Sequence, residues 1–293
     1  MEIEEGTLKL AKKISLYMFL SILAIVFFMP FFIILTTSFK TLQETSMSGF
    51  TILPSSFQYE NFLKAFQGGN WLRYYFNSFI VTFITVVGSL IINSLAGYVL
   101  ARLNIKGSNF MLMFFLLGIM MPFQTYIIPQ FIILKNIPFA SGNNILGQGG
   151  MGWINTYMGL IIPFLTGSFG IFLCRQFYMT FPKALDEAAK IDGCNPLTTY
   201  LRIYLPLSTP ILATLLILKS VSVWNNFFYP LIITNTQDMY TVQLGLQRFM
   251  GYSQIEWPVL MAATLISILP VVLVFLFAQK YYIQGMANTG VKG

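Results

Sequence analysis

One polar stretch of the chain, residues 181–206, carries side chains that suit a specific contact with another protein. It reads FPKALDEAAKIDGCNPLTTYLRIYLP, and its acidic pair, Asp186 and Glu187, is followed directly by Ala188 and Ala189. Two minimal side chains beside two carboxylates make a helix surface that can sit deep in a partner's cleft, where the carboxylates can meet cations. The simpler alternative is an amphipathic surface hairpin whose acidic residues only solvate it.

The same stretch has the start and stop signals of two short helices joined by a turn. Pro182 suits the first turn of a helix, and Gly193 suits the left-handed backbone conformation that ends one. Asn195 can then cap a second helix that has Pro196 in its first position. We therefore expect a helix-turn-helix here.

A second group of candidates consists of polar side chains inside strongly apolar stretches. Trp224, Asn225 and Asn226 could line a path for a polar solute such as a sugar, but hydrogen bonding between helices is slightly favoured. Asn93 belongs to a stripe of small residues with four-residue spacing, which favours close helix packing over ligand contact. The candidates for a solute path are Asn93, Gln124, Trp224, Asn225 and Asn226.

Residue types and motifs that are absent from the sequence exclude several classes of enzyme and metalloprotein. It contains no His, which removes Ser/His triads, zinc peptidase motifs and haem ligation. Cys174 and Cys194 form neither a CxxC nor a CxxCH motif. Without a Gly-Lys dipeptide the chain cannot hold a GxxxxGK[ST] phosphate loop, so any ATP must bind to a partner. We expect no metal site, no cofactor in this chain and no enzyme activity.

The elements that must position these residues are transmembrane helices. Of the 293 residues, 56% are hydrophobic and 9% are charged, with a mean hydropathy of +0.71, whereas soluble domains contain about 25% charged residues. A helix needs about 20 apolar residues to cross the hydrocarbon core. The apolar runs predict an all-α polytopic membrane protein with six transmembrane helices, at residues 14–38, 76–101, 110–134, 157–178, 210–234 and 258–279.

The distribution of Lys and Arg predicts the orientation, since short loops rich in these residues stay in the cytoplasm. Of the 17 such residues, one, Lys219, falls inside the fifth run, where it either has a function or extends to an interface. Five lie in the predicted outer loops, namely Lys40, Lys64, Arg73, Lys135 and Arg248, and the other 11 lie on the side of the termini. We therefore expect cytoplasmic segments at 1–13 and 281–293 around a six-span domain at 14–280. Because the cations are dispersed, a nucleic-acid partner is disfavoured.

The two longer outer segments differ in composition. In the first, Tyr59, Phe62, Leu63 and Phe66 have helical spacing, which is consistent with a short helix on the membrane surface and equally with a passive connector. The second, residues 137–155, contains five glycines and favours an irregular loop.

Several motifs resemble one family of transporters. The segments 187–189, 192–193 and 205–206 form EAAxxDG followed by LP, which resembles the EAA motif of ATP-binding cassette (ABC) importers. Further segments are similar to the second permease subunit of carbohydrate importers of the maltose-transporter type: GYVLAR at 97–102, GLIIP at 159–163, WNNFFYPL at 224–231 and VKG at 291–293. The sequence departs from this pattern at Asn226, where the family commonly has Glu, and in its longer glycine-rich loop.

The resemblance implies a permease in the cell membrane whose cytoplasmic loop, residues 181–206, docks onto a cytoplasmic ATPase dimer that binds ATP and Mg. The coupling residues it implies are Asp186, Glu187, Ala188, Ala189, Asp192 and Gly193. The other implied partners are a homologous second permease, an extracytoplasmic sugar-binding protein and membrane lipid.

Other functions stay open at this point. An importer of glycerol phosphate or another small polar solute is the first alternative, because such importers share the pattern. A secondary carrier is less favoured because no acidic residue lies in a predicted span to bind a proton. An intramembrane enzyme is less favoured still, because neither His nor a paired intramembrane carboxylate is present.

Overall fold

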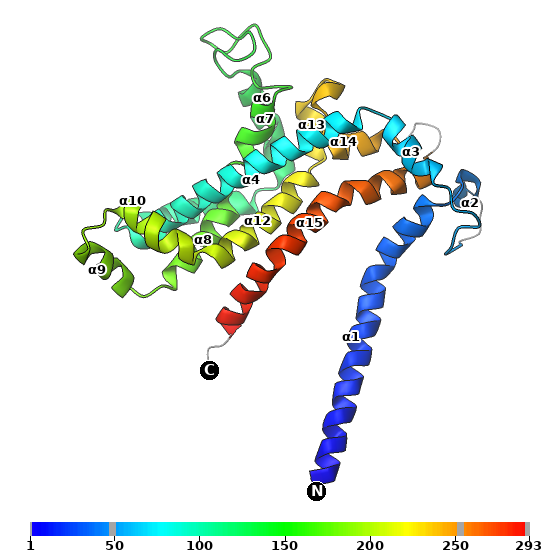
Figure 1. The fold of residues 1–293 in the computed structure, drawn as a ribbon. Helices are drawn as coiled ribbons and strands as arrows, with labels where there is room; N and C mark the ends of the chain where they lie inside the picture. Colours follow the sequence, from blue (N-terminus) through cyan, green and yellow to red (C-terminus); the bar gives the residue numbers. More distant parts are fainter. Residues whose placement is uncertain (1, 47–50, 251–254, 291–293) are drawn as a thin grey trace. The chain divides into compact units, whose positions relative to one another are not determined.

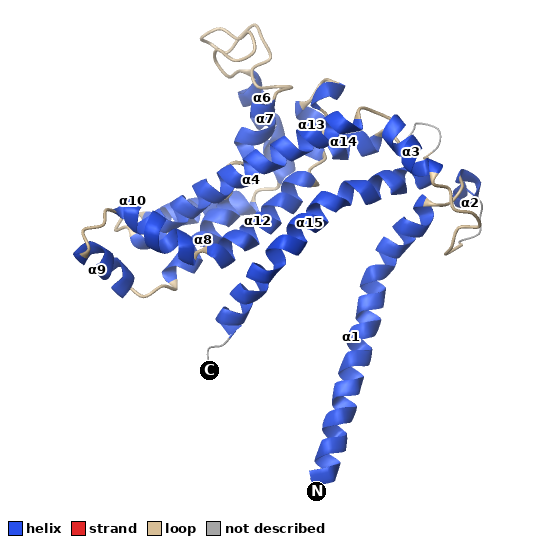
Figure 2. Ribbon diagram, viewed as in Figure 1, coloured by secondary structure: helices blue, strands red, loops and turns tan. Residues whose placement is uncertain are grey.

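The fold is known from a computed structural model that describes residues 2–46, 51–250 and 255–290, so the VKG segment at 291–293 lies outside the described residues. Its regular structure is helical (Figure 2). The chain divides into two compact units. One comprises Met1–Gly69 with Leu246–Ile268, and the other comprises Asn70–Gly245 with Leu269–Gly293. Helix α15 (Trp257–Gly290) contributes to both units.

The first unit contains the long helix α1 (Glu2–Ser38), followed by α2 (Leu42–Ser46) and α3 (Glu60–Gln67). Helix α3 confirms a short helix, the first of the two alternatives for this segment. The connection between α1 and α3 is held by Asn61, whose amide donates to the carbonyl oxygens of Ser38 and Lys40, both at 2.9 Å. Glu44 accepts hydrogen bonds from the backbone N–H groups of Thr41 (2.7 Å) and Ser55 (2.8 Å), and these bonds lower the pKa of Glu44 to about 2.

The second unit is organised around α4 (Trp71–Arg102), beside which α8 (Ser168–Met179) and α12 (Thr209–Trp224) pack (Figure 1). Close approach of α4 and α8 depends on Gly97. A Cβ atom there would lie 2.5 Å from the Cβ of Cys174 and 2.8 Å from the backbone nitrogen of Arg175. The stripe of small residues on α4 is therefore a packing surface, as its spacing predicted.

The remaining elements of this unit are short. They are α5 (Ser108–Met120), α6 (Phe123–Lys135), α7 (Tyr157–Ile161), η1 (Ile162–Phe164), α9 (Ala184–Ile191), α10 (Pro196–Thr199), the π-helical turn η2 (Tyr200–Tyr204), α11 (Leu205–Leu207), α13 (Phe228–Ile233), η3 (Gln237–Met239) and α14 (Val242–Gln247), the last of which ends in the first unit. Within the described ranges, four helical segments can cross a membrane by length and composition, and six can if each of two bent pairs counts as one span.

The two bent pairs change the predicted third and fifth spans. Helices α5 and α6 meet at an angle of 103°, at Met121 and Pro122, so residues 110–134 do not form one straight helix. Both residues have extended backbones, because proline has no N–H to continue the ladder and disfavours a helical residue before it. The segment Pro196–Leu207 meets α12 at 76°.

The predicted fifth span at 210–234 is also wrong at its end. Helix α12 ends at Trp224, and α13 begins only at Phe228, so Asn225 and Asn226 lie in a break between two helices. The side chain of Asn226 accepts a hydrogen bond from the backbone N–H of Tyr229 at 3.2 Å, which satisfies a free donor at the start of α13.

The glycine-rich loop between α6 and α7 is irregular, as its composition predicted, and Figure 1 shows it standing out beyond these two helices. Four of its glycines, at 142, 147, 149 and 152, have positive φ. Asn143 orders the loop from within, since its amide donates to the carbonyl oxygens of Lys135 (2.7 Å) and Ile137 (2.9 Å) and accepts from the N–H of Gly150 (2.8 Å).

Candidate coupling site

Residues 181–206 form the predicted helix-turn-helix. Helix α9 (Ala184–Ile191) is followed by Gly193 with a φ of +72°, the left-handed conformation that glycine adopts without strain. Asn195 caps α10 by accepting a hydrogen bond from the N–H of Thr198 at 2.8 Å. Pro182 differs from the prediction, because it lies two residues before α9 rather than in its first turn.

Helix α9 has two different faces. Asp186 is half-buried and Ala189 is only 1% exposed, so these two residues face the rest of the chain. Glu187 and Ala188 are exposed, and Ile191 is 87% exposed. An exposed isoleucine beside a carboxylate and a small side chain gives an outer face with room for a partner surface. Asp192 and Gly193 are exposed as well.

Asp186 has a role inside the chain that the sequence did not indicate. One carboxylate oxygen lies 2.5 Å from Nη2 of Arg102, at the end of α4, and the other accepts a hydrogen bond from the hydroxyl of Tyr204 at 2.7 Å. Arg102 also donates to the carbonyl oxygens of Phe181 and Pro182, each at 3.1 Å. Its guanidinium carbon lies 5.3 Å from the centre of the Tyr204 ring. We call Arg102, Asp186 and Tyr204 the anchor; it ties α9 to α4.

Beneath the anchor lies a tyrosine cluster that the sequence did not indicate: Tyr98, Tyr178, Tyr200 and Tyr204. Its ring centres are 5.0 to 6.1 Å apart in the contacting pairs. The hydroxyl of Ser94 bonds to those of Tyr178 (2.6 Å) and Tyr200 (3.0 Å), and that of Tyr98 donates to the carbonyl of Pro196 (3.1 Å). Because its members come from α4, α8 and η2, the cluster joins the 181–206 segment to both packed helices. The four-residue spacing of Tyr200 and Tyr204, which places both rings on one side of a helix, is the sequence signal from which this cluster could have been predicted.

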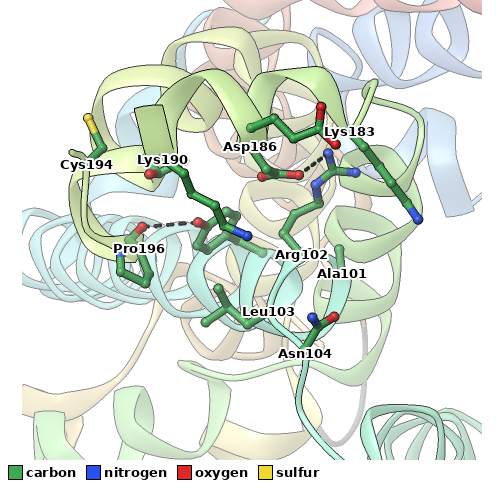
Figure 3. Close-up of a pocket in the computed structure, with 12 residues that line it drawn as sticks. Ala101, Arg102, Leu103, Asn104, Lys183, Asp186, Lys190, Cys194 and Pro196 are labelled. Carbon is green, nitrogen blue, oxygen red and sulfur yellow. Dashed lines mark hydrogen bonds and ion pairs between the residues drawn. The ribbon is translucent and has the colours of Figure 1, made fainter. Parts of the chain in front are cut away.

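A cavity of about 510 Å³ lies between α9 and the end of α4 (Figure 3). Its wall mixes cations and anions, with Arg102, Lys183 and Lys190 near Asp186 and Glu187. Helix α9 is therefore separated from the end of α4 by this cavity over part of its length. Hydrogen bonds and the ion pair of the anchor consequently contribute much of its attachment. Among the described residues, no group of His, Cys, Asp and Glu is placed to hold a metal ion.

The candidates for a solute path do not form one site in this structure. Asn93 is buried between α4 and α8, where its amide donates to Ser89 Oγ (2.8 Å) and accepts from the N–H of Gly167 (3.1 Å), so its contacts are those of helix packing. Gln124 is exposed on α6.

The other three path candidates meet at the end of α12. Trp224 is buried, and its ring centre lies 6.2 Å from that of Tyr75. Asn225 is exposed and accepts a hydrogen bond from the amide of Gln243 at 3.1 Å. Asn226 is half-buried beside it and stabilises the start of α13. Whether the two amides also contact solute stays a prediction.

The chain has apolar helices long enough to span a membrane, and the short helix α9 is anchored to them by its inner face while its outer face is exposed. These features define an integral membrane subunit that works with a partner. The family model described as "Binding-protein-dependent transport system inner membrane component" matches residues 93–288, and the chain belongs to this family. It is a multi-pass permease subunit, not the ATPase of such a system.

Relatives and a solved structure agree with this assignment. The chain is 31% identical to the arabinooligosaccharides transport system permease protein AraQ of Bacillus subtilis (strain 168), over 96% of each chain. It is 27% identical to the sn-glycerol-3-phosphate transport system permease protein UgpE of Brucella suis biovar 1 (strain 1330), over 94% of this chain and 95% of UgpE. A chain in the crystal structure of a bacterial ABC transporter that imports the acidic polysaccharide alginate has the same fold, with a TM-score of 0.77 at 22% identity, covering 93% of this chain and 96% of that one.

Proposed function

We propose that this chain is the permease subunit of an ABC importer for a carbohydrate and that it couples half of the solute path to a partner ATPase. The observation that carries the proposal is the division of α9 into a free outer face and an anchored inner face. The similarity to an arabinooligosaccharide permease supports the substrate class. A homologous second permease completes the path, and ATP and Mg bind to the ATPase.

In this proposal ATP closes the ATPase dimer, and α9 moves with the ATPase surface that it contacts. Asp186 uses both carboxylate oxygens to hold Arg102 and Tyr204, so a displacement of α9 is transmitted to α4. The tyrosine cluster extends the connection to α8 through Tyr178. The bundle has two conformations, and the docked, closed ATPase changes the free-energy difference between them. The size of that change is the coupling free energy.

The other side of the unit offers a surface for the extracytoplasmic binding protein. Phe139, Ile145 and Leu146 are 77%, 70% and 73% exposed on the ordered glycine-rich loop. Large apolar side chains held outward on an ordered loop suit contact with another protein. The family description supports a binding protein as that partner.

Glycerol phosphate is the second candidate substrate, supported by the similarity to UgpE. Calorimetric titration of the cognate binding protein with an arabinooligosaccharide, a neutral glucan and glycerol 3-phosphate separates the two substrates. Binding of glycerol 3-phosphate alone would replace the carbohydrate proposal.

Replacement of Glu187 by Ala tests the docking role of α9. Its exposed carboxylate lies in the first turn of α9, where it can meet a cation of the ATPase, and a charged hydrogen bond is worth about 1.5–3 kcal/mol. We therefore expect the variant to lower both transport and the ATP hydrolysis stimulated by loaded binding protein about 10-fold, measured in proteoliposomes with all partners.

The matched control is Glu60→Ala, which removes another exposed first-turn carboxylate, on α3. It should retain wild-type activity. Full stimulation in Glu187→Ala would contradict the docking role.

Orientation is testable with single cysteines in a Cys174→Ala, Cys194→Ser background. Leu146 is 73% exposed on the glycine-rich loop, and Lys106 is exposed just after α4. We expect an impermeant maleimide to label Leu146→Cys in intact cells and Lys106→Cys only after permeabilisation. Labelling of Lys106→Cys in intact cells would place the 181–206 segment outside and refute the coupling proposal.

A further inference from the structure

Lys219 is a half-buried cation on α12 that the coupling mechanism does not use. Its ammonium group lies 5.8 Å from the centre of the Phe164 ring, and no ion pair or hydrogen bond engages it among the described residues. The candidate spans of the described chain contain no Asp or Glu that could neutralise it. A cation at membrane depth is costly unless something compensates its charge.

Lys219 lies inside its candidate span rather than at either end of it. It is ten residues after Thr209, the first residue of α12, and five before Trp224, the last, which correspond to about 15 Å and about 7.5 Å along the helix. Phe164, which it contacts, is likewise inside the candidate span Tyr157–Met179 rather than at its ends. Both residues therefore lie within apolar segments of membrane-spanning length.

The polar groups nearest Lys219 are engaged with one another, and none of them is an acid: the N–H of Gly167 donates to Asn93 Oδ1, and the amide of Asn93 donates to Ser89 Oγ. Its nitrogen lies 4.0 Å from the position that a Cβ atom on Gly167 would take, and the amide nitrogen of Asn93 lies 3.9 Å from the same point. Gly167 has an extended backbone and precedes the 12-residue helix α8, whose first turn receives no side-chain cap. The positive end of the α8 dipole thus adds to the charge of Lys219.

The same side of α12 leads toward the predicted path residues. Val223, one turn after Lys219, lines a small cavity together with Phe164 and Asn226. Phe164 therefore lies beside the Lys219 ammonium group and also lines the small cavity that Asn226 lines.

We propose that Lys219 binds the anionic group of the transported solute, a carboxylate or a phosphate, as the solute crosses the membrane. The inference rests on the proposed function and specifies its substrate class: an acidic sugar or a sugar-like phosphate rather than a neutral saccharide. The ammonium provides the charge, and the positive end of the α8 dipole makes the site unfavourable for a cation.

Transport by the complete complex in proteoliposomes tests the proposal, with wild type, Lys219→Met and Lys219→Arg. The probes are trigalacturonate, glycerol 3-phosphate and maltotriose. We expect wild type to transport one of the two anionic probes, which also distinguishes carboxylate from phosphate. Lys219→Met should lower that uptake at least 10-fold, Lys219→Arg should retain most of it, and stimulation of ATP hydrolysis by loaded binding protein should persist. Lys106→Met, which removes an exposed cation outside the spans, is the matched control and should behave as wild type.

The following results would overturn this inference alone. One is wild-type transport of maltotriose and neither anion, and another is loss of the permease pair from the purified Lys219→Met complex, which would assign the cation to a contact between subunits. Anion uptake that is unchanged in Lys219→Met would overturn it as well. A wild-type complex that transports an arabinooligosaccharide but none of the three probes would also overturn the inference alone, whereas one that transports none of these four solutes would refute the proposed function and the inference with it.

Discussion

Replacement of Arg102 by Ala is expected to lower solute transport about 100-fold while the complex still hydrolyses ATP. The Arg102 side chain is 7% exposed and that of Asp186 is 26% exposed, so the variant leaves a largely buried carboxylate without its cation. Breaking a buried ion pair in this way costs about 3–5 kcal/mol. It also removes the bonds to Phe181 and Pro182, which hold the chain just before α9. Helix α9 can then move with the ATPase without carrying α4.

The measurement is the ratio of solute transported to ATP hydrolysed in proteoliposomes, together with the amount of assembled complex. The exchange variant Arg102→Asp with Asp186→Arg restores opposite charges and should recover part of the transport lost in either single variant. Asp186→Asn keeps an acceptor for Tyr204 and should be milder than Asp186→Ala. An unchanged ratio in Arg102→Ala would show that the anchor does not transmit movement.

Replacement of Gly97 by Val is expected to prevent normal packing of α4 against α8. A Cβ atom at this position would lie 2.5 Å from Cys174 Cβ, 2.8 Å from the nitrogen of Arg175 and 3.0 Å from the carbonyl carbon of Cys174. Two of these atoms belong to the backbone of α8, so no side-chain rotation can relieve the overlap. Overpacking of this kind costs about 3 kcal/mol, which lowers the melting temperature by about 5–10 °C.

Thermal unfolding of the purified protein in detergent checks this expectation. The control is Gly88→Ala on the same helix, where the atom nearest the new Cβ is the terminal Cδ2 of Leu165 at 2.6 Å, which can move aside. We expect a melting temperature for Gly88→Ala within about 2 °C of wild type. Equal melting temperatures for Gly97→Val and wild type would mean that α4 and α8 do not approach as closely as described.

Local signals predicted the parts of the coupling site that depend on a few neighbouring residues. Gly193 and Asn195 act through their own backbone and the next turn, so sequence alone indicated their conformations. Asp186 is different, because its direction depends on Arg102, which is 84 residues away in the sequence. The sequence therefore placed Asp186 with the docking residues, whereas the fold turns it inward.

For the transmembrane helices, too, the features that depend on local sequence were predicted and those that depend on distant packing were not. Apolar composition predicted where membrane helices occur, but not whether Pro122 would bend or merely interrupt its helix, since this depends on the packing around it. The end of α12 at Trp224 was missed because the residues after Asn226 are as apolar as those before it. Composition reports burial in lipid and carries little information about the continuity of a helix.

The π-helical turn Tyr200–Tyr204 sets a constraint on the length of the chain. A π-turn holds more residues per turn than an α-helix, so deleting one residue here would let the ladder return to regular α-helical bonding. Because the π-turn absorbs its extra residue, the elements on either side would keep nearly the same orientation, but the spacing between Tyr200 and Tyr204 would change from four residues to three. The two rings would then lose the spacing with which both reach the tyrosine cluster. Homologues of this protein should therefore vary in residue type along this segment far more readily than in the number of residues between Gly193 and Pro206.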